Sequence, residues 1–172
     1  MEESKLESEF NKDFSRMSFQ CIDAIEISLF IEKEGLGFYE KAAKNVSDPR
    51  VRDIFLRLAE EEREHIQVLQ TKVKFLKPAI SVKGKTKSKV DSFIRDKLKG
   101  KIFPVSGNNL VKKFTSTEEA LSYGIESEKR SIEVLNSLLS NEKKLDVKTI
   151  FAHLVTEEKK HLALLEDFKA TM

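Results

Sequence analysis

The chain repeats itself at one fixed offset, and this repeat limits the possible folds more than any other feature. When the sequence is shifted by 96 residues, residues 24–69 fall on residues 120–165 without a gap. The same offset serves two successive segments, so each copy of the repeat is a pair of segments with one short connection. The fold must therefore place two similar halves around one core.

The segments of the repeat have the apolar spacing of amphipathic helices. Phe55, Leu58 and Leu69 recur at helical intervals, and their repeat partners Phe151, Leu154 and Leu165 do the same. We predict long helices over residues 18–45, 49–76, 116–140 and 146–170, with a short helix near 90–98.

Helix starts are indicated by capping residues. Asp48, followed by Pro49, suits the start of the second helix. Ser116 and Glu119 have capping-box spacing at the third, and we expect Asp146 to cap the fourth.

The connection lengths then give the fold class. Two short connections and one long one predict an all-α protein, a ferritin-like antiparallel four-helix bundle built from two repeated helix hairpins. We expect a single domain over residues 1–172. Its parts are a lead-in at 1–17, a first hairpin at 18–76, a basic crossover at 77–115 and a second hairpin at 116–170.

Composition excludes several classes of protein. The sequence has 172 residues, 40% hydrophobic and 35% charged, which suits one helical domain. Cys21 is its only cysteine, which excludes an intrachain disulfide framework and a four-cysteine metal site. No apolar run approaches ~20 residues and the first residues are charged, so we expect a cytoplasmic protein without a membrane partner.

Glutamates lie on the apolar stripes of all four long helices. Glu62 precedes His65 by three residues, so both side chains leave one face of a helix. The repeat places Glu158 and His161 at the matching positions. Glu32 and Glu128 match each other on the remaining two helices.

Buried carboxylates need cations, and this set predicts a pair of metal ions. Four glutamates carry a charge that two divalent cations balance, and each histidine can supply one nitrogen ligand. Oxygen and imidazole donors favour iron, with manganese possible, over a structural zinc. A single Glu-x-x-His is a weak signal, whereas two in one register are specific. His153 lacks a Glu three residues earlier, and we interpret it as a surface or packing histidine.

These residues resemble the rubrerythrin-like branch of the ferritin-like diiron proteins. The likeness covers about residues 18–170. It depends on the run from Glu32 to Tyr39, the two Glu-x-x-His motifs and Glu128. The resemblance implies that Tyr39 steadies a carboxylate across the site. It implies six metal ligands, with Glu62 and Glu158 bridging: Glu32, Glu62, His65, Glu128, Glu158 and His161.

The resemblance also implies a function. It indicates a non-haem diiron oxidoreductase that reduces H2O2 or oxidises Fe(II), using H2O2 or O2, in oxidative-stress defence. Two departures matter: rubrerythrins add a four-cysteine rubredoxin domain, and they carry a further Glu where this chain has Ser131. We therefore expect a separate rubredoxin-type electron donor.

Other functions and assemblies stay open at this stage. The alternative function is binding or sequestration of iron without turnover. The basic stretch from Lys83 to Lys89 prompts a nucleic-acid hypothesis, but it lacks interleaved aromatic residues and arginines, so we expect no such partner. A homo-oligomer, such as a dimer, is expected, and the long crossover offers a route to exchange between subunits.

Overall fold

The computed structural model describes residues 17–80, 86–103 and 114–172. The predicted lead-in lies almost wholly outside these residues, as do parts of the crossover. Within them every regular element is helical, which confirms the all-α prediction. The elements are α2 (Cys21–Asn45), α3 (Pro49–Ile80), α4 (Thr86–Phe93), the π-helical turn η1 (Ile94–Leu98), α5 (Thr117–Asn141) and α6 (Leu145–Ala170).

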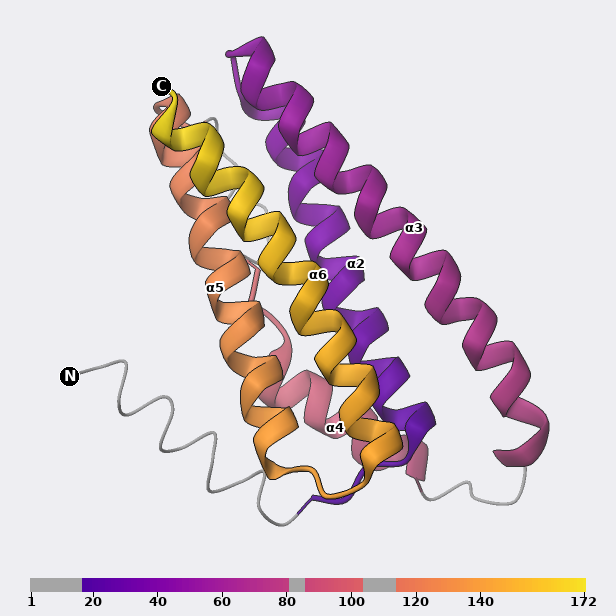
Figure 1. Ribbon diagram of the computed structural model, residues 1–172. Helices are drawn as coiled ribbons and strands as arrows, with labels where there is room; N and C mark the ends of the chain where they lie inside the picture. Colours follow the sequence, from indigo (N-terminus) through magenta and orange to yellow (C-terminus); the bar gives the residue numbers. More distant parts are fainter. Residues whose placement is uncertain (1–16, 81–85, 104–113) are drawn as a thin grey trace.

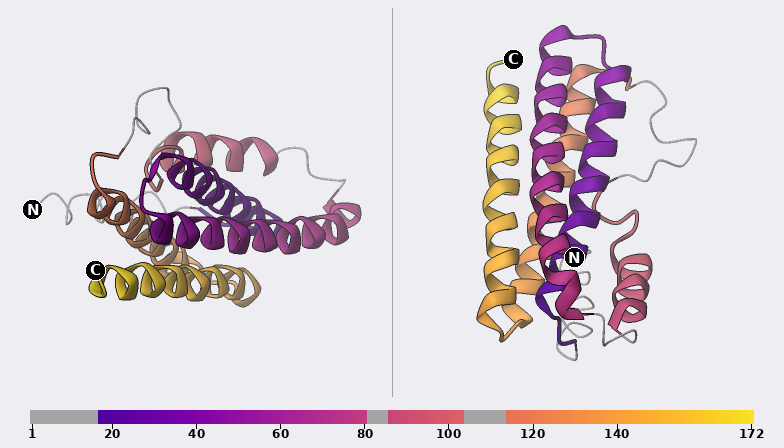
Figure 2. Two further views of the ribbon diagram at one scale, coloured as in Figure 1. Left: turned by 90° about the horizontal axis from the view of Figure 1, so that it is seen from above. Right: turned by 90° about the vertical axis from the view of Figure 1, so that its right-hand side faces the viewer.

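Four long helices form the bundle, and they pair as two antiparallel hairpins (Figure 1). The first hairpin is α2 with α3, and the second is α5 with α6. The segment between α3 and α5 carries the chain back along the bundle, so α5 runs in the same direction as α3 (Figure 2). None of the helices in the described ranges is long and apolar enough to cross a membrane.

The starts of the helices follow local hydrogen bonding. The Gln20 amide donates to the Asp23 carboxylate at 2.7 Å, so α2 begins at Cys21 rather than at the predicted residue 18. Asp48 accepts a hydrogen bond from the Arg50 amide at 2.9 Å, as predicted for its cap. Ser116 likewise accepts from the Glu119 amide at 3.0 Å.

Two helix ends differ from the predictions. Helix α6 begins at Leu145 after Lys144, so the prediction that Asp146 caps it is wrong. Asp146 instead lies in the first turn, where its carboxylate accepts from the Cys21 thiol at 2.9 Å. Helix α3 continues past Pro78 to Ile80, because a proline in the last turns removes only one terminal hydrogen bond.

The described middle part of the crossover, residues 86–103, contributes to the core. Its buried side chains pack against α2 and α5, and the Phe103 ring lies 5.8 Å from that of Phe38. The Arg130 guanidinium also donates to the Ile102 carbonyl at 2.9 Å. Five apolar side chains of these residues are therefore covered by the bundle. They are Val90, Phe93, Leu98, Ile102 and Phe103.

Candidate metal centre

The six side chains predicted as ligands meet inside the bundle. The four glutamates and His161 are each exposed by 1% or less. Glutamate side chains are rarely buried so completely in a protein core unless they are paired. Each hairpin contributes two glutamates and one histidine. The residues come from α2 (Glu32), α3 (Glu62 and His65), α5 (Glu128) and α6 (Glu158 and His161).

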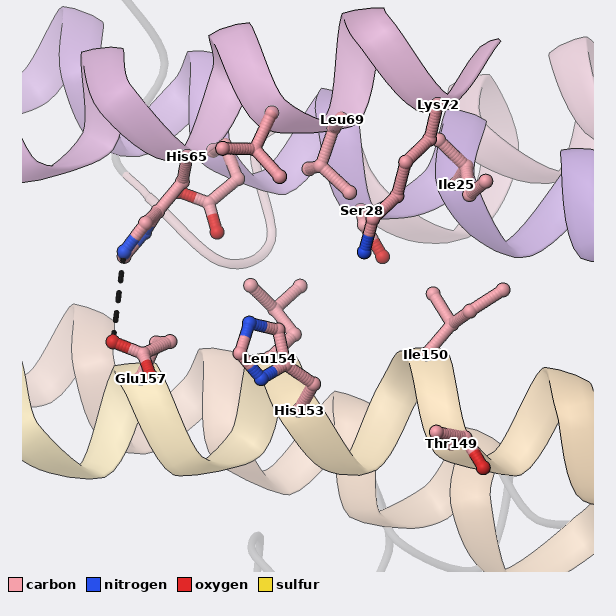
Figure 3. A pocket seen from close by; sticks show the side chains of 12 residues that line it. Ile25, Ser28, His65, Leu69, Lys72, Thr149, Ile150, His153, Leu154 and Glu157 are labelled. Atoms are coloured by element: carbon pink, nitrogen blue, oxygen red, sulfur yellow. Dashed lines mark ion pairs between the residues drawn. The ribbon is translucent and has the colours of Figure 1, made fainter. Parts of the chain in front are cut away.

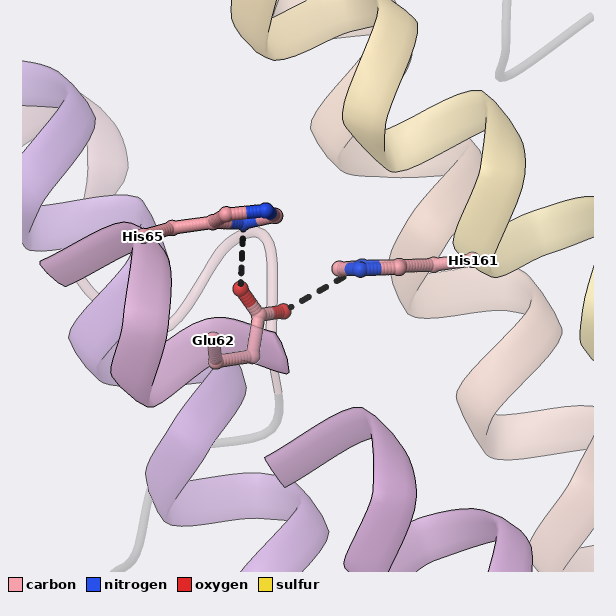
Figure 4. A group of neighbouring side chains, drawn as sticks. All are labelled: Glu62, His65 and His161. Atoms are coloured by element: carbon pink, nitrogen blue, oxygen red, sulfur yellow. Dashed lines mark ion pairs between the residues drawn. The ribbon is translucent and has the colours of Figure 1, made fainter. Parts of the chain in front are cut away.

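Glu62 lies between the two histidines. Its carboxylate oxygens are 3.9 Å from Nδ1 of His65 and 3.5 Å from Nδ1 of His161, which comes from the other hairpin (Figure 4). The two imidazole rings are nearly parallel, with centroids 5.7 Å apart. The three-residue spacing on α3 thus directs one carboxylate and one imidazole to the same point.

Both histidines turn Nδ1 toward the glutamates. Nδ1 of His65 is 3.3 Å from Glu32 Oε2, and Nδ1 of His161 is 3.7 Å from Glu128 Oε1. Donor atoms of Glu62 and the two histidines lie within 4.8 Å of one another, as do those of Glu32, Glu62 and Glu158. Glu128, Glu158 and His161 form a third such group.

Most of the carboxylate oxygens and imidazole nitrogens in this cluster have no hydrogen-bond partner among the described residues. Both oxygens of Glu32 and of Glu158 are buried without one, and so are both ring nitrogens of His161. Buried polar atoms are normally paired, because an unpaired one costs free energy. Unpaired carboxylate oxygens and imidazole nitrogens that face one another are suitable ligands for divalent metal ions such as iron or manganese.

The protonation of the metal-free cluster reflects its burial. Desolvation raises the pKa of Glu62 and of Glu128 well above the ordinary range, and the neighbouring carboxylates add to this. Burial also raises the pKa of Glu158 to about 7. The Glu32 carboxylate raises the pKa of His65, whereas burial lowers that of His161. Without bound cations, the cluster therefore reduces its negative charge by binding protons.

Tyr39 closes one side of the cluster. Its ring is fully buried on α2, and its hydroxyl donates a short hydrogen bond to Oε1 of Glu128 on α5. Burial, followed by the charge of Glu128, raises the pKa of the tyrosine well above its usual value. The phenol therefore stays protonated and fixes the position of one carboxylate.

Two further glutamates contact the outer edges of the histidines. Glu61 Oε2 is 3.3 Å from Nε2 of His161, and Glu157 Oε2 is 3.5 Å from Nε2 of His65. Each contact joins α3 to α6, so the two hairpins hold each other's imidazoles. Neither glutamate is among the six residues predicted as ligands. The signal that could have found both was the repeat, which places Glu61 on Glu157.

A glycine makes room for Glu62. A Cβ atom at Gly35 would lie 2.7 Å from Glu62 Oε1 and 3.2 Å from the Phe103 ring, closer than side chains pack. The repeat places Ser131 at the equivalent position on α5, where the hydroxyl is buried near Glu158 and lowers its pKa slightly against the effect of burial. The two halves thus differ next to their central glutamates.

The third histidine does not join the cluster. His153 is exposed on α6, one turn and more from Glu158, in keeping with its interpretation as a surface histidine. It lines a groove that runs beside the cluster between α3 and α6.

One comparison with known proteins gives a match. The family model described as Rubrerythrin matches residues 23–169, which include the six clustered residues, Tyr39 and the two outer glutamates. Searches of curated proteins and of solved structures give no match.

Proposed function

The chain belongs to the rubrerythrin family, and on this premise we propose that it is a non-haem diiron oxidoreductase that reduces H2O2 or oxidises Fe(II). The observation that carries the proposal is the buried cluster of four glutamates and two histidines whose donor atoms face one another unpaired. We further propose that it acts in oxidative-stress defence.

The residues that would hold the two metal ions are the six of the cluster. Glu62 and Glu158 lie centrally and are the proposed bridging ligands, while each imidazole offers its Nδ1 atom. Carboxylate and imidazole donors suit iron, our first choice, and also manganese. When bound, two iron ions would supply two electrons together to H2O2 or O2.

The protein's own part is to position ligands, exclude water and hold protons. Glu61 and Glu157 fix the Nε2 side of each histidine, which leaves Nδ1 as the inward donor. Tyr39 keeps its proton on the hydroxyl oxygen and holds Glu128 by a hydrogen bond. Phe55 and Phe151 are fully buried and contribute to the dry apolar core around the cluster.

The electrons for repeated turnover must reach the centre from elsewhere. A rubredoxin-type iron site needs four cysteines, and this sequence contains only Cys21. Burial and the Asp146 carboxylate raise the pKa of that thiol to about 11, so it is not a ready thiolate. We propose a separate rubredoxin-type protein as the donor.

Reconstitution with iron tests the proposal. Fe(II) is added without oxygen to the metal-free protein, the bound iron is counted, and H2O2 is then added while its consumption and the diferric absorption are followed. We expect two iron ions per chain and peroxide consumption above that of E62A and E158A. Glu64→Ala is the control, because Glu64 is exposed on the same helix and outside the cluster.

The outcomes separate the two candidate functions. Two bound iron ions without peroxide consumption or Fe(II) oxidation would favour binding and sequestration of iron, which is the alternative. If E62A and E158A bind as much iron as the unaltered protein, the cluster is not the metal site and the proposal fails.

A further inference from the structure

A groove opens beside the cluster, where α3 diverges from α6 (Figures 1 and 3). Its volume is about 350 Å³, within the range of about 300–1,000 Å³ typical of small-molecule sites. Of the six clustered residues, only Glu32 and His65 line it. The groove therefore reaches the edge of the cluster without being part of it.

The groove is larger and more apolar than an oxidant requires. Its walls include Ile25 from α2, Leu69 from α3, and Ile150 and Leu154 from α6. A molecule of the size of water occupies roughly 30 Å³, so the groove has space for a ligand many times larger than H2O2 or O2. Its walls suit a hydrocarbon chain.

The charges along the groove differ at its two ends. Glu32, His65 and Glu157 form the end next to the cluster, where the carboxylates repel an anion. Lys72 lies toward the other end, and Figure 3 shows its side chain pointing from α3 into the gap between the helices. In the part of the chain that the structure describes, no ion pair engages this ammonium. His153 points into the same gap from α6.

From this arrangement we propose that the groove binds an organic anion with an apolar chain, such as a medium-chain fatty acid. Lys72 holds the carboxylate, and the chain lies along Leu69, Ile150 and Leu154 with its end toward His65. The orientation follows from the charges, because the reverse one would place the anion beside Glu32 and Glu157. This inference goes beyond the proposed oxidoreductase function and needs no bound metal.

The size of the groove favours a small ligand over a second copy of the chain. Stable interfaces bury about 800 Å² on each partner. This groove instead has a volume of about 350 Å³, with walls from three helices and Lys72 at its outer end. A second copy is nevertheless a distinct outcome of the test below.

Binding of decanoate to the metal-free, full-length protein tests the proposal. Decanoate is titrated below its micelle concentration, with calorimetry for affinity and amide chemical shifts for location. We expect saturable binding of one molecule, with shifts confined to the parts of α2, α3 and α6 around the groove. Decanol, which has the same chain and no charge, should bind at least about tenfold more weakly.

Two lysines on one helix provide a matched pair. Lys72→Glu should weaken decanoate binding by at least about tenfold, since it replaces a charge-assisted hydrogen bond with repulsion. Lys74→Glu should leave it unchanged, because Lys74 is also exposed but does not line the groove. Ile150→Trp fills the groove and should abolish binding, with circular dichroism to confirm that the variant folds.

Three results would overturn the proposal: no saturable binding, equal affinity for decanoate and decanol, or equal effects of K72E and K74E. Sedimentation velocity can give a fourth: if the protein is a dimer that Ile150→Trp dissociates and decanoate does not, the groove is covered by a second copy of the chain. Iron oxidation by the loaded, unaltered protein is a separate measurement. If the unaltered protein binds decanoate but does not oxidise iron, only the oxidoreductase proposal is refuted. If it oxidises iron but does not bind decanoate, only the groove proposal is refuted.

Discussion

The first hairpin, α2 with α3, and the second, α5 with α6, contribute equivalent sets of two glutamates and one histidine to the cluster but expose them differently. The His65 side chain is 23% exposed and lies at the groove, whereas the His161 side chain is 1% exposed. The sequence repeat cannot produce this difference, since both histidines follow a glutamate by three residues. It arises because the groove between α3 and α6 is lined by His65 and not by His161.

The same contrast continues in the residues next to the cluster. Gly35 on α2 corresponds to Ser131 on α5, and Tyr39 corresponds to Leu135. One half thus has a glycine against its central glutamate and a phenol reaching across the bundle, while the other has neither. The repeat therefore gives both hairpins the same arrangement of glutamates and histidine, whereas the surrounding packing leaves His65 accessible at the groove and encloses His161.

The largest effect is expected for Gly35→Ala, which tests the difference between Gly35 and its repeat partner Ser131. Gly35→Ala places a methyl group 2.7 Å from Glu62 Oε1, so the carboxylate must leave its present position between the two histidines. We expect iron binding to fall well below two ions per chain, measured by metal analysis after reconstitution. Ser131→Ala, which only removes a hydroxyl, should keep both ions.

Gly37→Ala is the control for the change in helix propensity. No atom lies within 4 Å of a Cβ atom at Gly37, so this variant should be more stable by about 1 kcal/mol and bind iron normally. Normal iron content in G35A would show that the close approach of Gly35 to Glu62 is not required.

A second prediction concerns pH and the metal-free protein. Because the pKa values of Glu62, Glu128 and Glu158 are raised in the folded state, these groups stabilise it when protonated. That stability is present below the ordinary glutamate pKa and is lost as the pH rises, for Glu158 through about 7. Glu158 alone contributes about 3 kcal/mol to the free energy of unfolding at low pH. The unfolding temperature should therefore fall between pH 5 and pH 8.

Two histidines modify this pH profile in opposite directions. The raised pKa of His65 adds to the loss of stability with rising pH, while the lowered pKa of His161 opposes it below about pH 6.5. Glu62→Gln and Glu158→Gln should each flatten the profile, since an amide does not titrate. Calorimetry of the two variants side by side compares the halves, and an unchanged slope in both would contradict the prediction.

The third prediction compares the outer glutamates. Glu61→Ala removes the partner of the enclosed His161, and Glu157→Ala removes that of the exposed His65. Loss of such a partner typically weakens metal binding by about 10- to 100-fold. We expect E61A to reach the upper part of this range, because water cannot replace the contact at a buried ring. Competition with a chelator measures both affinities.

The control for this pair is Glu60→Ala. Glu60 is exposed and pairs with Arg63 on the surface, so its loss should change metal affinity little. Equal affinities of E61A and E157A would show that exposure of the histidine does not matter.

The smallest expected effect concerns Tyr39. Tyr39→Phe removes its hydrogen bond to Glu128 and leaves the ring in place, so we expect a loss of about 1–2 kcal/mol of metal-binding free energy. Tyr123→Phe is the matched control, since the only other tyrosine is partly exposed and away from the cluster. A calorimetric iron titration that gives equal affinities for the two variants would exclude a role for the Tyr39 hydroxyl.

Much of this protein could be predicted from local pattern alone. Helical spacing located the four long helices, and the caps at Asp48 and Ser116 are where expected. The burial of Glu32, Glu62, Glu128 and Glu158 follows from apolar neighbours at helical intervals, because a helix carries its stripe as a rigid surface. The Asp146 cap failed because helix α6 begins at Leu145, so Asp146 lies within the first turn and its carboxylate accepts from the Val147 amide and the Cys21 thiol.

Spacing within each helix and one repeat offset predict the helices, the pairing of the hairpins and the six side chains that converge in the core. The contacts between side chains of different helices, such as Tyr39 with Glu128 and Glu61 with His161, follow from the tertiary structure, and so does the place of Lys72 at the groove. Such contacts depend on the distance and angle between helices. These are set by packing over the whole interface and are not encoded in the period of any one segment.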